Sequence, residues 1–578
     1  MKEFKKIDLA NKEINLIDYP NPSKIREKIR MLNGLWDFSF DGKIWKKIKV
    51  PFCPESKLSG IQYTSFINKC YYKKRFRYVK NDNRLILHFG AVDYLTSVFI
   101  NGNFVGEHRG GYTSFEFDIT DYIVSGNNEI YLSIIDNLEN ICSGKQSKKE
   151  QSFGCFYTRI TGIWQNVWIE ERNVDYIQNF YFYPNIEDGS VNISLVSSTK
   201  GNCRIEIFYK GEIVGEKIFE IDCFANVKIS LKEKHLWDVY SSNIYYVKIN
   251  FRNDVVFGYF GLREASYIGN KFFLNKRSIY QKMVLHQGYY EDGICTPANV
   301  AVMRKDILSA KRLGFNGIRL HQKVFDPRFL YLCDIIGMMV WGEFASWGID
   351  YFSLNNLEQF LIEWKEVVNR DFNHPSIITW CPLNEVWSCK EKVRDINFIE
   401  KVYFFTKQLD STRPCVDVSG GHHCEYTDLF DFHSYELPSE LSKYLNILDK
   451  EKVLDVQLLY DERENIKYDG NKAVNLSECG GFALVDKKSR SVVKTVNNDA
   501  VLAEDDWGYG EQETNANVFI SRYKELIETI YSNKTISGFC YTQLFDIEQE
   551  KNGFFYYNRK SKLTKKQIEK IREINSLR

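Results

Sequence analysis

The chain has 578 residues, of which 44% are hydrophobic and 15% aromatic, so it can bury several cores and its length favours three or four domains. Its 77 Lys and Arg residues nearly balance its 76 Asp and Glu residues, which argues against nucleic acid or a charged membrane surface as a partner. The first residues lack the apolar run of a signal peptide, and no apolar stretch approaches membrane-spanning length. The 14 cysteines include no C-x-x-C pair, so we expect free thiols and a cytoplasmic protein.

Consecutive short strands fill the region from Gly34 to Arg172. Leu85–Phe89 and Glu129–Ile135 are two of them, and Asn101-Gly102 is a hairpin-turn signal. No segment with helical periodicity interrupts the strands. We therefore predict a β-sandwich of the jelly-roll type, with a domain at residues 1–173.

A second all-β segment runs from Val174 to Glu264. Val191–Leu195 and Cys203–Ile207 both alternate polar and apolar residues, as half-buried strands do. A segment of about ninety residues suits an immunoglobulin-like sandwich of about seven strands. The second domain is placed at residues 174–264.

Near Ala265 the pattern changes to alternating strands and helices. Thr296-Pro297 offers a helix N-cap and a proline at the first helical position. Asp326-Pro327 repeats this signal, and Gly337 ends the second helix. The predicted strands are Lys282–His286, Phe315–Leu320, Met338–Trp341, Ile377–Trp380, Cys415–Val418, Leu429–His433, Ala473–Ser477 and Ile536–Tyr541. Repeated strand–helix units in this number predict a TIM (β/α)8 barrel at residues 265–578.

Two glutamates follow the fourth and the seventh predicted strand of this barrel. Glu385 is preceded by Asn384, and Glu478 lies before a Gly-Gly pair. Because the carboxyl ends of barrel strands meet at one mouth, we expect the two carboxylates to lie about 5–5.5 Å apart. Glu478 would then attack an anomeric carbon, while Glu385 would protonate the leaving group and later activate water. Repulsion between the two groups would keep one pKa raised, which suits the acid. For an isolated Asn-Glu pair, a structural salt bridge is the alternative.

Motifs along nearly the whole chain carry a resemblance to a known family. They are Leu32–Trp36, His108–Asp118 and Thr161–Trp168 in the first domain, and Gly314–His321, Tyr331–Glu343, Asn384-Glu385 and Ser477-Glu478 in the barrel. In this order and spacing they resemble glycoside hydrolase family 2, which includes β-galactosidases, β-glucuronidases and β-mannosidases. The resemblance implies the jelly-roll, immunoglobulin-like and barrel domains, with Glu385 as acid/base and Glu478 as nucleophile.

The resemblance also implies roles for side chains around the two glutamates. Asn384 would bind the sugar 2-hydroxyl, Arg319 would keep the nucleophile ionised, and Tyr435 would hydrogen-bond it. His321 is a candidate ligand for sugar or carboxylate, with a core histidine as the alternative. Candidates for substrate-stacking aromatic residues, each with core packing as its alternative, are Trp347, Trp387 and Trp507. Tyr541, which stands where the family has a tryptophan, is a further candidate for substrate binding.

Two further segments bear on cofactors and on sugar specificity. His422-His423-Cys424 with His433 could suggest a metal, but adjacent histidines are poor co-ligands, so we expect neither a metal nor another cofactor. Family glucuronidases bind the substrate carboxylate with an Asn-x-Lys motif, and the corresponding positions here are Glu550-Lys551-Asn552. The glutamate should repel a uronate, although Lys551 or Asn552 could still serve from a shifted loop.

The sequence therefore predicts a retaining exo-β-glycosidase that hydrolyses terminal β-linked hexosides, with a β-galactoside favoured over a β-glucuronide or β-mannoside. A catalytically silent carbohydrate-binding protein on the same frame is the alternative from another class. The two glutamates together with Asn384, Arg319 and Tyr435 argue against that alternative, because a binding protein does not need the pair. The expected partner is a carbohydrate substrate, without nucleic acid or membrane, and a homo-oligomer is compatible with the sequence.

Overall fold

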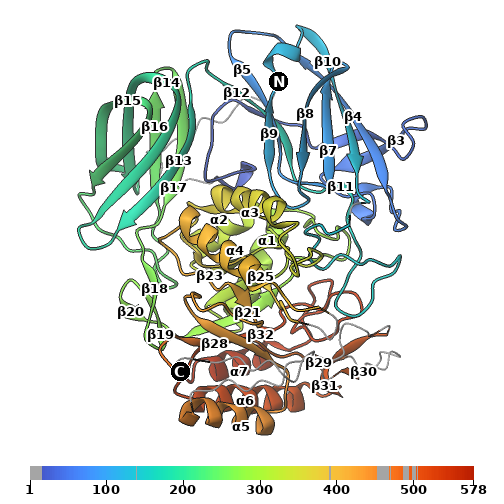
Figure 1. Cartoon of the computed structure of the whole chain (residues 1–578), viewed down its shortest axis with the longest axis vertical. Coiled ribbons are helices and arrows are strands. Elements are labelled where there is room, and N and C mark those ends of the chain that lie inside the picture. The colour runs from blue at the N-terminus through green and yellow to red at the C-terminus, as the bar shows by residue number, and fades with distance from the viewer. Residues whose placement is uncertain are drawn as a thin grey trace.

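A computed structural model of the chain contains two β-rich modules that lie against one side of an α/β barrel (Figure 1). The first module is blue to cyan, the second is green, and the barrel runs from light green to red. The structure describes residues 16–137, 139–388, 392–451, 468, 470–485, 494–496, 503 and 505–578. Each of the three parts has its own buried core, and a further cluster around Trp237 and Trp341 joins the second module to the barrel. The expected domain bounds 1–173, 174–264 and 265–578 stay a prediction.

The first module consists of two main antiparallel sheets. One contains, in spatial order, β1 (Ile29–Met31), β12 (Val167–Arg172), β5 (Arg84–Phe89) and β9 (Phe115–Asp118). The other contains β3 (Lys46–Val50), β2 (Gly34–Ser39), β4 (Lys69–Tyr78), β10 (Gly126–Ile135), β7 (Leu95–Ile100) and β8 (Asn103–Arg109). A short pair, β6 (Val92–Asp93) and β11 (Gly162–Ile163), lies beside them. The predicted hairpin turn is confirmed, because Asn101 and Gly102 connect β7 to β8 with φ values of 51° and 83°.

The second module has five strands, so the expected number of seven is wrong. They are β13 (Ile177–Asn185), β14 (Ser190–Tyr209), β15 (Glu212–Ser230), β16 (Tyr245–Phe251) and β17 (Asp254–Phe260). Val191–Leu195 and Cys203–Ile207 are two halves of the single strand β14, the first paired with β13 and the second with β16. A register shift after Val196 bends this strand without ending it. A small sheet of β18 (Ala265–Ile268), β19 (Lys271–Leu274) and β20 (Arg277–Ser278) follows.

The barrel is built on a curled parallel sheet, which confirms the predicted TIM barrel. In spatial order its strands are β24 (Ile377–Cys381), β23 (Met339–Glu343), β22 (Gly317–Leu320), β21 (Gln281–His286), β32 (Ile536–Thr542), β28 (Val474–Gly480) and β27 (Phe430–Ser434). The strand expected at Cys415–Val418 is shorter, since only a bridge from Cys415 to Trp380 and the pair of β26 (Val418–Ser419) with β25 (Leu383–Asn384) occupy this place. Near the mouth, β29 (Phe482–Leu484), β31 (Trp507–Glu513) and β30 (Lys494–Val496) form a separate sheet.

The helices that accompany the barrel strands are α1 (Val300–Arg312), α2 (Pro327–Ile336), α3 (Leu357–Asp371), α4 (Ile396–Leu409), α5 (Pro438–Glu451), α6 (Ala516–Ser532) and α7 (Lys565–Asn575). Asp326 caps α2 and Gly337 ends it, as predicted. Helix α1 begins later than predicted, because Asn299 is its N-cap. Thr296 instead donates a hydrogen bond of 2.5 Å to the carbonyl oxygen of Trp164 and so ties the barrel to the first module.

All cysteines in the described ranges are free thiols. Among the described helices, none is both long enough and apolar enough to cross a membrane. The cytoplasmic location stays a prediction.

Candidate active site

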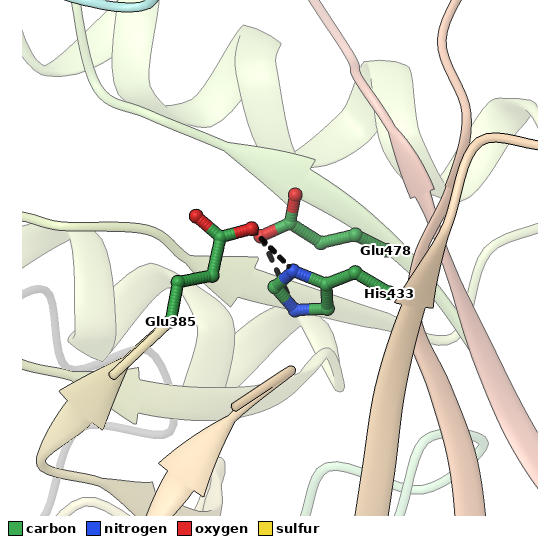
Figure 2. Close-up of side chains that lie close together, drawn as sticks. All are labelled: Glu385, His433 and Glu478. Carbon is green, nitrogen blue, oxygen red and sulfur yellow. Dashed lines mark hydrogen bonds and ion pairs between the residues drawn. The ribbon is translucent and has the colours of Figure 1, made fainter. Parts of the chain in front are cut away.

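The two predicted glutamates meet at the mouth of the barrel. Glu385 directly follows β25, and Glu478 lies within β28. An oxygen of each carboxylate and a ring nitrogen of His433 all lie within 4.8 Å of one another. Figure 2 shows the two carboxylates side by side with the imidazole next to both. Glu385 has a φ of 49°, a conformation rare for residues other than glycine, so its backbone is held in a strained turn at the point where its side chain enters the mouth.

The environment of Glu478 favours a carboxylate. Arg319, on β22, donates a hydrogen bond of 2.8 Å from a terminal guanidinium nitrogen to Oε1 of Glu478. Tyr435 donates its hydroxyl to Oε2. Burial alone would raise the pKa of Glu478, but the positive charges of His433 and Arg319 outweigh it and lower the pKa to about 2. Glu478 is therefore ionised at neutral pH.

Arg319 connects the nucleophile candidate to two other strand ends. Its Nε donates to Oε2 of Glu343 at 2.8 Å, and its other terminal nitrogen donates to Oδ1 of Asn384 at 2.6 Å. The Nδ2 of Asn384 is buried and has no hydrogen-bond partner among the described residues. Arg319 thus orients this amide, and its Nδ2 has no acceptor within the described part of the chain. Glu343 was missed by the sequence analysis, although it ends the Tyr331–Glu343 motif.

His433 links the two glutamates. Its Nδ1 lies 2.7 Å from Oε1 of Glu385, and its Nε2 lies 3.6 Å from Oε1 of Glu478. Burial lowers the pKa of His433, but the negative charges of Glu478 and Glu385 more than offset it, so the pKa is raised. The sequence analysis considered this histidine only as a metal ligand, although it ends the sixth predicted strand.

The cluster of Glu385, His433 and Glu478 has the spacing of a metal site. The guanidinium of Arg319 already neutralises Glu478, and a second cation there would be repelled. His423 has both ring nitrogens within 3.0 Å of buried aspartates, so it is engaged as part of a charged network. The residues present therefore fit proton transfer better than metal coordination.

A cleft of about 570 Å³ opens over the two glutamates. Its aromatic lining consists of Phe156, Trp347, Tyr351, Phe352, Trp387, Tyr435, Trp507 and Tyr509. The three predicted tryptophans are all present, and the indole of Trp347 donates a hydrogen bond of 3.2 Å to the carbonyl oxygen of Asn384. Flat apolar faces beside carboxylates are typical of sites that bind sugar rings.

Besides the buried Arg319 and Asn384, two further predicted site residues do not line the cleft. His321 is buried, with its Nδ1 3.0 Å from Oε1 of Glu343, which also accepts from Gln322. The ring of Tyr541 packs on that of Phe554 in the barrel core, with 4.8 Å between the ring centroids. The next residue, Thr542, lines the cleft instead.

The Glu550–Asn552 loop presents only its glutamate to the cleft. Lys551 donates its ammonium group to the carbonyl oxygen of Glu548 and lies 3.7 Å from Asp506. Asn552 is fully buried and donates a hydrogen bond of 2.8 Å to Oε1 of Glu550. Neither the lysine nor the asparagine is therefore placed to bind a substrate carboxylate.

The first module supplies one wall of the cleft. The segment after β10 reaches the barrel mouth, where the backbone N–H of Ser143 donates to the carbonyl oxygen of Trp347 at 2.8 Å. Lys145 follows and places its ammonium nitrogen 4.5 Å from the centre of the Trp347 ring system. The sequence analysis missed Lys145, because no pattern marks a loop of one module as part of a site on another.

Two family models match the chain. The sugar-binding domain of glycosyl hydrolases family 2 matches residues 63–172, and the TIM barrel domain of the same family matches residues 268–556. The chain is 26% identical over 409 residues to a β-galactosidase of Thermoanaerobacter pseudethanolicus, covering 66% of this chain and 53% of that protein. It is 24% identical over 443 residues to a β-glucuronidase of Streptococcus agalactiae, covering 68% and 72%. The chain spans about half the length of the first curated relatives that it matches.

Solved structures share the fold over nearly the whole chain. A β-D-glucuronidase of Dictyoglomus thermophilum superposes with a TM-score of 0.77 at 20% identity, covering 97% of this chain and 99% of that one. A β-galacturonidase of Eisenbergiella tayi superposes with a TM-score of 0.74 at 20% identity, covering 95% and 98%. Since the barrel model alone matches half of the residues, the chain belongs to glycoside hydrolase family 2.

Proposed function

We propose that the protein is a retaining exo-β-glycosidase that removes terminal neutral β-linked hexoses. The observation that carries this proposal is the approach of Glu385 and Glu478, whose carboxylate oxygens lie within 4.8 Å at the mouth of a barrel. Retaining glycosidases hold their two carboxyl groups about 5–5.5 Å apart, which leaves no room for a water molecule to attack from the opposite face of the sugar.

Each step of the double displacement falls to a side chain in a suitable environment. Glu478, ionised and oriented by Tyr435, attacks the anomeric carbon, while Glu385 protonates the departing oxygen. Glu385 then removes a proton from the water that cleaves the glycosyl-enzyme. The free Nδ2 of Asn384 donates to the sugar 2-hydroxyl, a contact that strengthens in the transition state.

The charges of the cleft favour a neutral sugar. The cleft lining has four acidic side chains (Asp350, Glu385, Glu478 and Glu550) and three lysines (Lys145, Lys148 and Lys392), so a uronate carboxylate would add to an excess of negative charge. Glu550 and Asn552 stand at the positions of the carboxylate-binding Asn and Lys in the resemblance to family glucuronidases, and Lys551 and Asn552 are engaged elsewhere. A β-galactoside is the favoured substrate, as the relative from Thermoanaerobacter suggests.

A β-glucuronidase is the second candidate. The Lys145 ammonium group in the cleft could neutralise a uronate, and relatives from Streptococcus and Dictyoglomus are described as β-glucuronidases. In this alternative Lys145 would bind the substrate carboxylate, because Lys551 does not line the cleft.

The test is a panel of nitrophenyl β-glycosides, namely galactoside, glucoside, mannoside, glucuronide and galacturonide, assayed with the wild type and with Glu478→Gln. We expect turnover of a neutral glycoside, a first-formed product that keeps the β configuration by NMR, and loss of turnover in Glu478→Gln. Turnover of uronides alone would replace the proposal with the second candidate. Inverted product would rule out retention, and no turnover of any glycoside would support the carbohydrate-binding alternative.

A further inference from the structure

The floor of the cleft holds a polar side chain that the proposed mechanism does not use. Gln287 follows β21 and is 1% exposed. Its Nε2 donates at 3.0 Å to the hydroxyl of Tyr157 and at 3.0 Å to Oε1 of Gln543. Its own Oε1 has no hydrogen-bond partner among the described residues, although it is buried. A buried acceptor without a donor is unfavourable, so this atom marks a place where a ligand donor would be stabilised.

Lys145 places a hydrogen-bond donor, its ammonium group, in the same cleft. Its side chain is largely buried, and within the described part of the chain its ammonium forms neither a hydrogen bond nor an ion pair. Burial lowers the pKa of Lys145, but Cys155, Glu550 and the two catalytic glutamates more than offset it, so the pKa is raised. The cleft therefore contains a charged donor that lies over the aromatic face of Trp347 and has no hydrogen-bond acceptor within the described part of the chain.

Glu550 supplies a second hydrogen-bond acceptor, and two hydrogen bonds from neighbouring side chains fix the orientation of its carboxylate. Tyr157 donates to its Oε2, and Asn552 donates to its Oε1 at 2.8 Å. Each carboxylate oxygen can accept a further hydrogen bond, and Glu550 lines the cleft, so this capacity is open to a ligand. Because Tyr157 also accepts from Gln287, the two acceptors form one connected network.

We propose that Lys145, Glu550 and Gln287 form a subsite that binds the hydroxyl groups of a neutral hexose, an inference that rests on the proposed function. A sugar hydroxyl both accepts and donates, so one hydroxyl can accept from the Lys145 ammonium while it or its neighbour donates to Glu550 or Gln287. A carboxylate would only accept. It would leave Oε1 of Gln287 without a donor and would add a further negative charge beside Glu550.

The subsite is shared between two parts of the molecule. Gln287 and Glu550 belong to the barrel, whereas Lys145 belongs to the segment that follows β10 of the first module. Backbone hydrogen bonds from Ser143 to Trp347 and from Gly144 to Ala345, of 2.8 and 3.2 Å, fix the start of that segment on the barrel. Correct docking of the first module is thus a condition for binding the sugar.

The experiment uses Lys145→Gln and Glu550→Gln in the full chain, with Lys149→Gln as a matched control. Lys149 is exposed, lies on the same segment and does not line the cleft. The Lys149→Gln variant should therefore bind the hexoside with the affinity of the wild type. Calorimetry with methyl β-hexosides measures binding without requiring turnover. We expect at least tenfold weaker binding of the neutral methyl β-hexoside to both cleft variants. For the wild type, kcat/KM should be about 100-fold or more lower for the deoxy analogue that lacks the bound hydroxyl than for the parent glycoside. In the two cleft variants this difference in kcat/KM should largely disappear.

The outcomes separate this subsite from the proposed function. If the wild type turns over no glycoside but its hexoside binding still depends on Lys145 and Glu550, the proposed function is overturned and the subsite is supported. Turnover of neutral glycosides with unchanged binding and unchanged deoxy discrimination in both variants would overturn the subsite. So would a wild type that binds no neutral hexoside, or a Lys145→Gln variant that loses only uronide turnover, since the ligand group would then be a carboxylate.

Discussion

At the scale of single residues, the site places one side-chain type in two different environments. Glu478 is 5% exposed and is held by Arg319 and Tyr435, which keep it charged. Glu385 lies at the more open side of the cleft, and the one hydrogen bond of its carboxylate among the described residues is with His433. A fixed charge suits a nucleophile, and a more accessible carboxyl that can exchange protons suits an acid/base.

We predict that Glu385→Ala lowers kcat/KM on glycosides with poor leaving groups by about 10²–10⁴-fold, because general acid assistance is lost. Azide should restore turnover of nitrophenyl glycosides, since a small anion fits the space left beside the anomeric carbon. The measurement is the rate with and without azide, together with identification of a β-glycosyl azide. Absence of rescue, or rescue of Glu478→Gln in its place, would contradict the assignment.

We predict that Arg319→Lys lowers kcat/KM at neutral pH by about tenfold or more, because one ammonium group cannot replace a fork that holds Glu478, Glu343 and Asn384 together. The acid limb of the pH–rate profile should also move to higher pH. Arg319 helps to hold the pKa of Glu478 at about 2, so weakening this contact lets the nucleophile protonate at a higher pH. A profile that overlays that of the wild type would show that Arg319 does not control this ionisation.

The sequence predicted the residues at strand ends better than the direction of their side chains. Arg319, Asn384 and Tyr435 were predicted from the resemblance to the family, and all three lie in the hydrogen-bond network around Glu478. Tyr541 and Thr542 are neighbours on β32, and only the second lines the cleft. Successive residues of a strand point to opposite faces, so a one-residue uncertainty in register decides which neighbour meets the substrate.

At the scale of elements, the segment that connects β10 to β11 matters most, because it forms a wall of the cleft. Gly144 lies on it with a φ of 56°, and a Cβ at this position would collide with the carbonyl oxygen of Gln322. Only glycine therefore fits both the backbone conformation and the space. The segment has no helical or strand pattern, so its place on the barrel was not predictable from the sequence.

We predict that Gly144→Ala lowers kcat/KM by about tenfold or more, since the segment must shift and carry Lys145 with it. Gly189→Ala is the matched control: its φ of 65° imposes the same backbone penalty, but its nearest neighbour is a lysine side chain at 3.7 Å in the second module. Kinetics and thermal unfolding of both variants provide the measurement. Equal kinetics in the two variants would mean that the segment tolerates displacement.

Elements were predicted well where local chemistry alone determines them. The Asp326 cap and the Gly337 end of α2 are examples, because both depend on a few neighbouring residues. Strand β14 was divided in two, and the strand at Cys415–Val418 was overestimated. In both cases the outcome depends on pairing with distant strands, which the local sequence does not specify.

At the scale of the whole molecule, the order of the three parts was predictable, since strand-only and strand–helix patterns occupy separate stretches of chain. How the parts dock was not, because docking depends on side chains that meet only in space. Thr296 in the barrel, for example, donates to the carbonyl oxygen of Trp164 in the first module, far away in the sequence. Distant residues also meet within the first module, where the backbone N–H of Thr161 donates to the buried carboxyl group of Glu55 at 3.2 Å. Burial raises the pKa of Glu55 to about 8.

We predict that the free energy of unfolding falls as the pH rises from about 5 to 8. The folded protein holds a proton on Glu55 that the unfolded chain, with a glutamate pKa of about 4.3, has released. The slope from this group is at most roughly 1.4 kcal/mol per pH unit. Glu55→Gln removes the titration and should flatten the profile, as measured by urea unfolding at a series of pH values. Parallel profiles for the two proteins would show that Glu55 titrates normally.

The division of the cleft between two parts of the molecule has an evolutionary consequence. The two glutamates proposed to break the glycosidic bond belong to a barrel strand and to the turn after another strand, while an opposing wall of the cleft comes from a loop of the first module. A lineage can therefore exchange that loop and acquire a new sugar preference while its bond-breaking machinery is inherited unchanged.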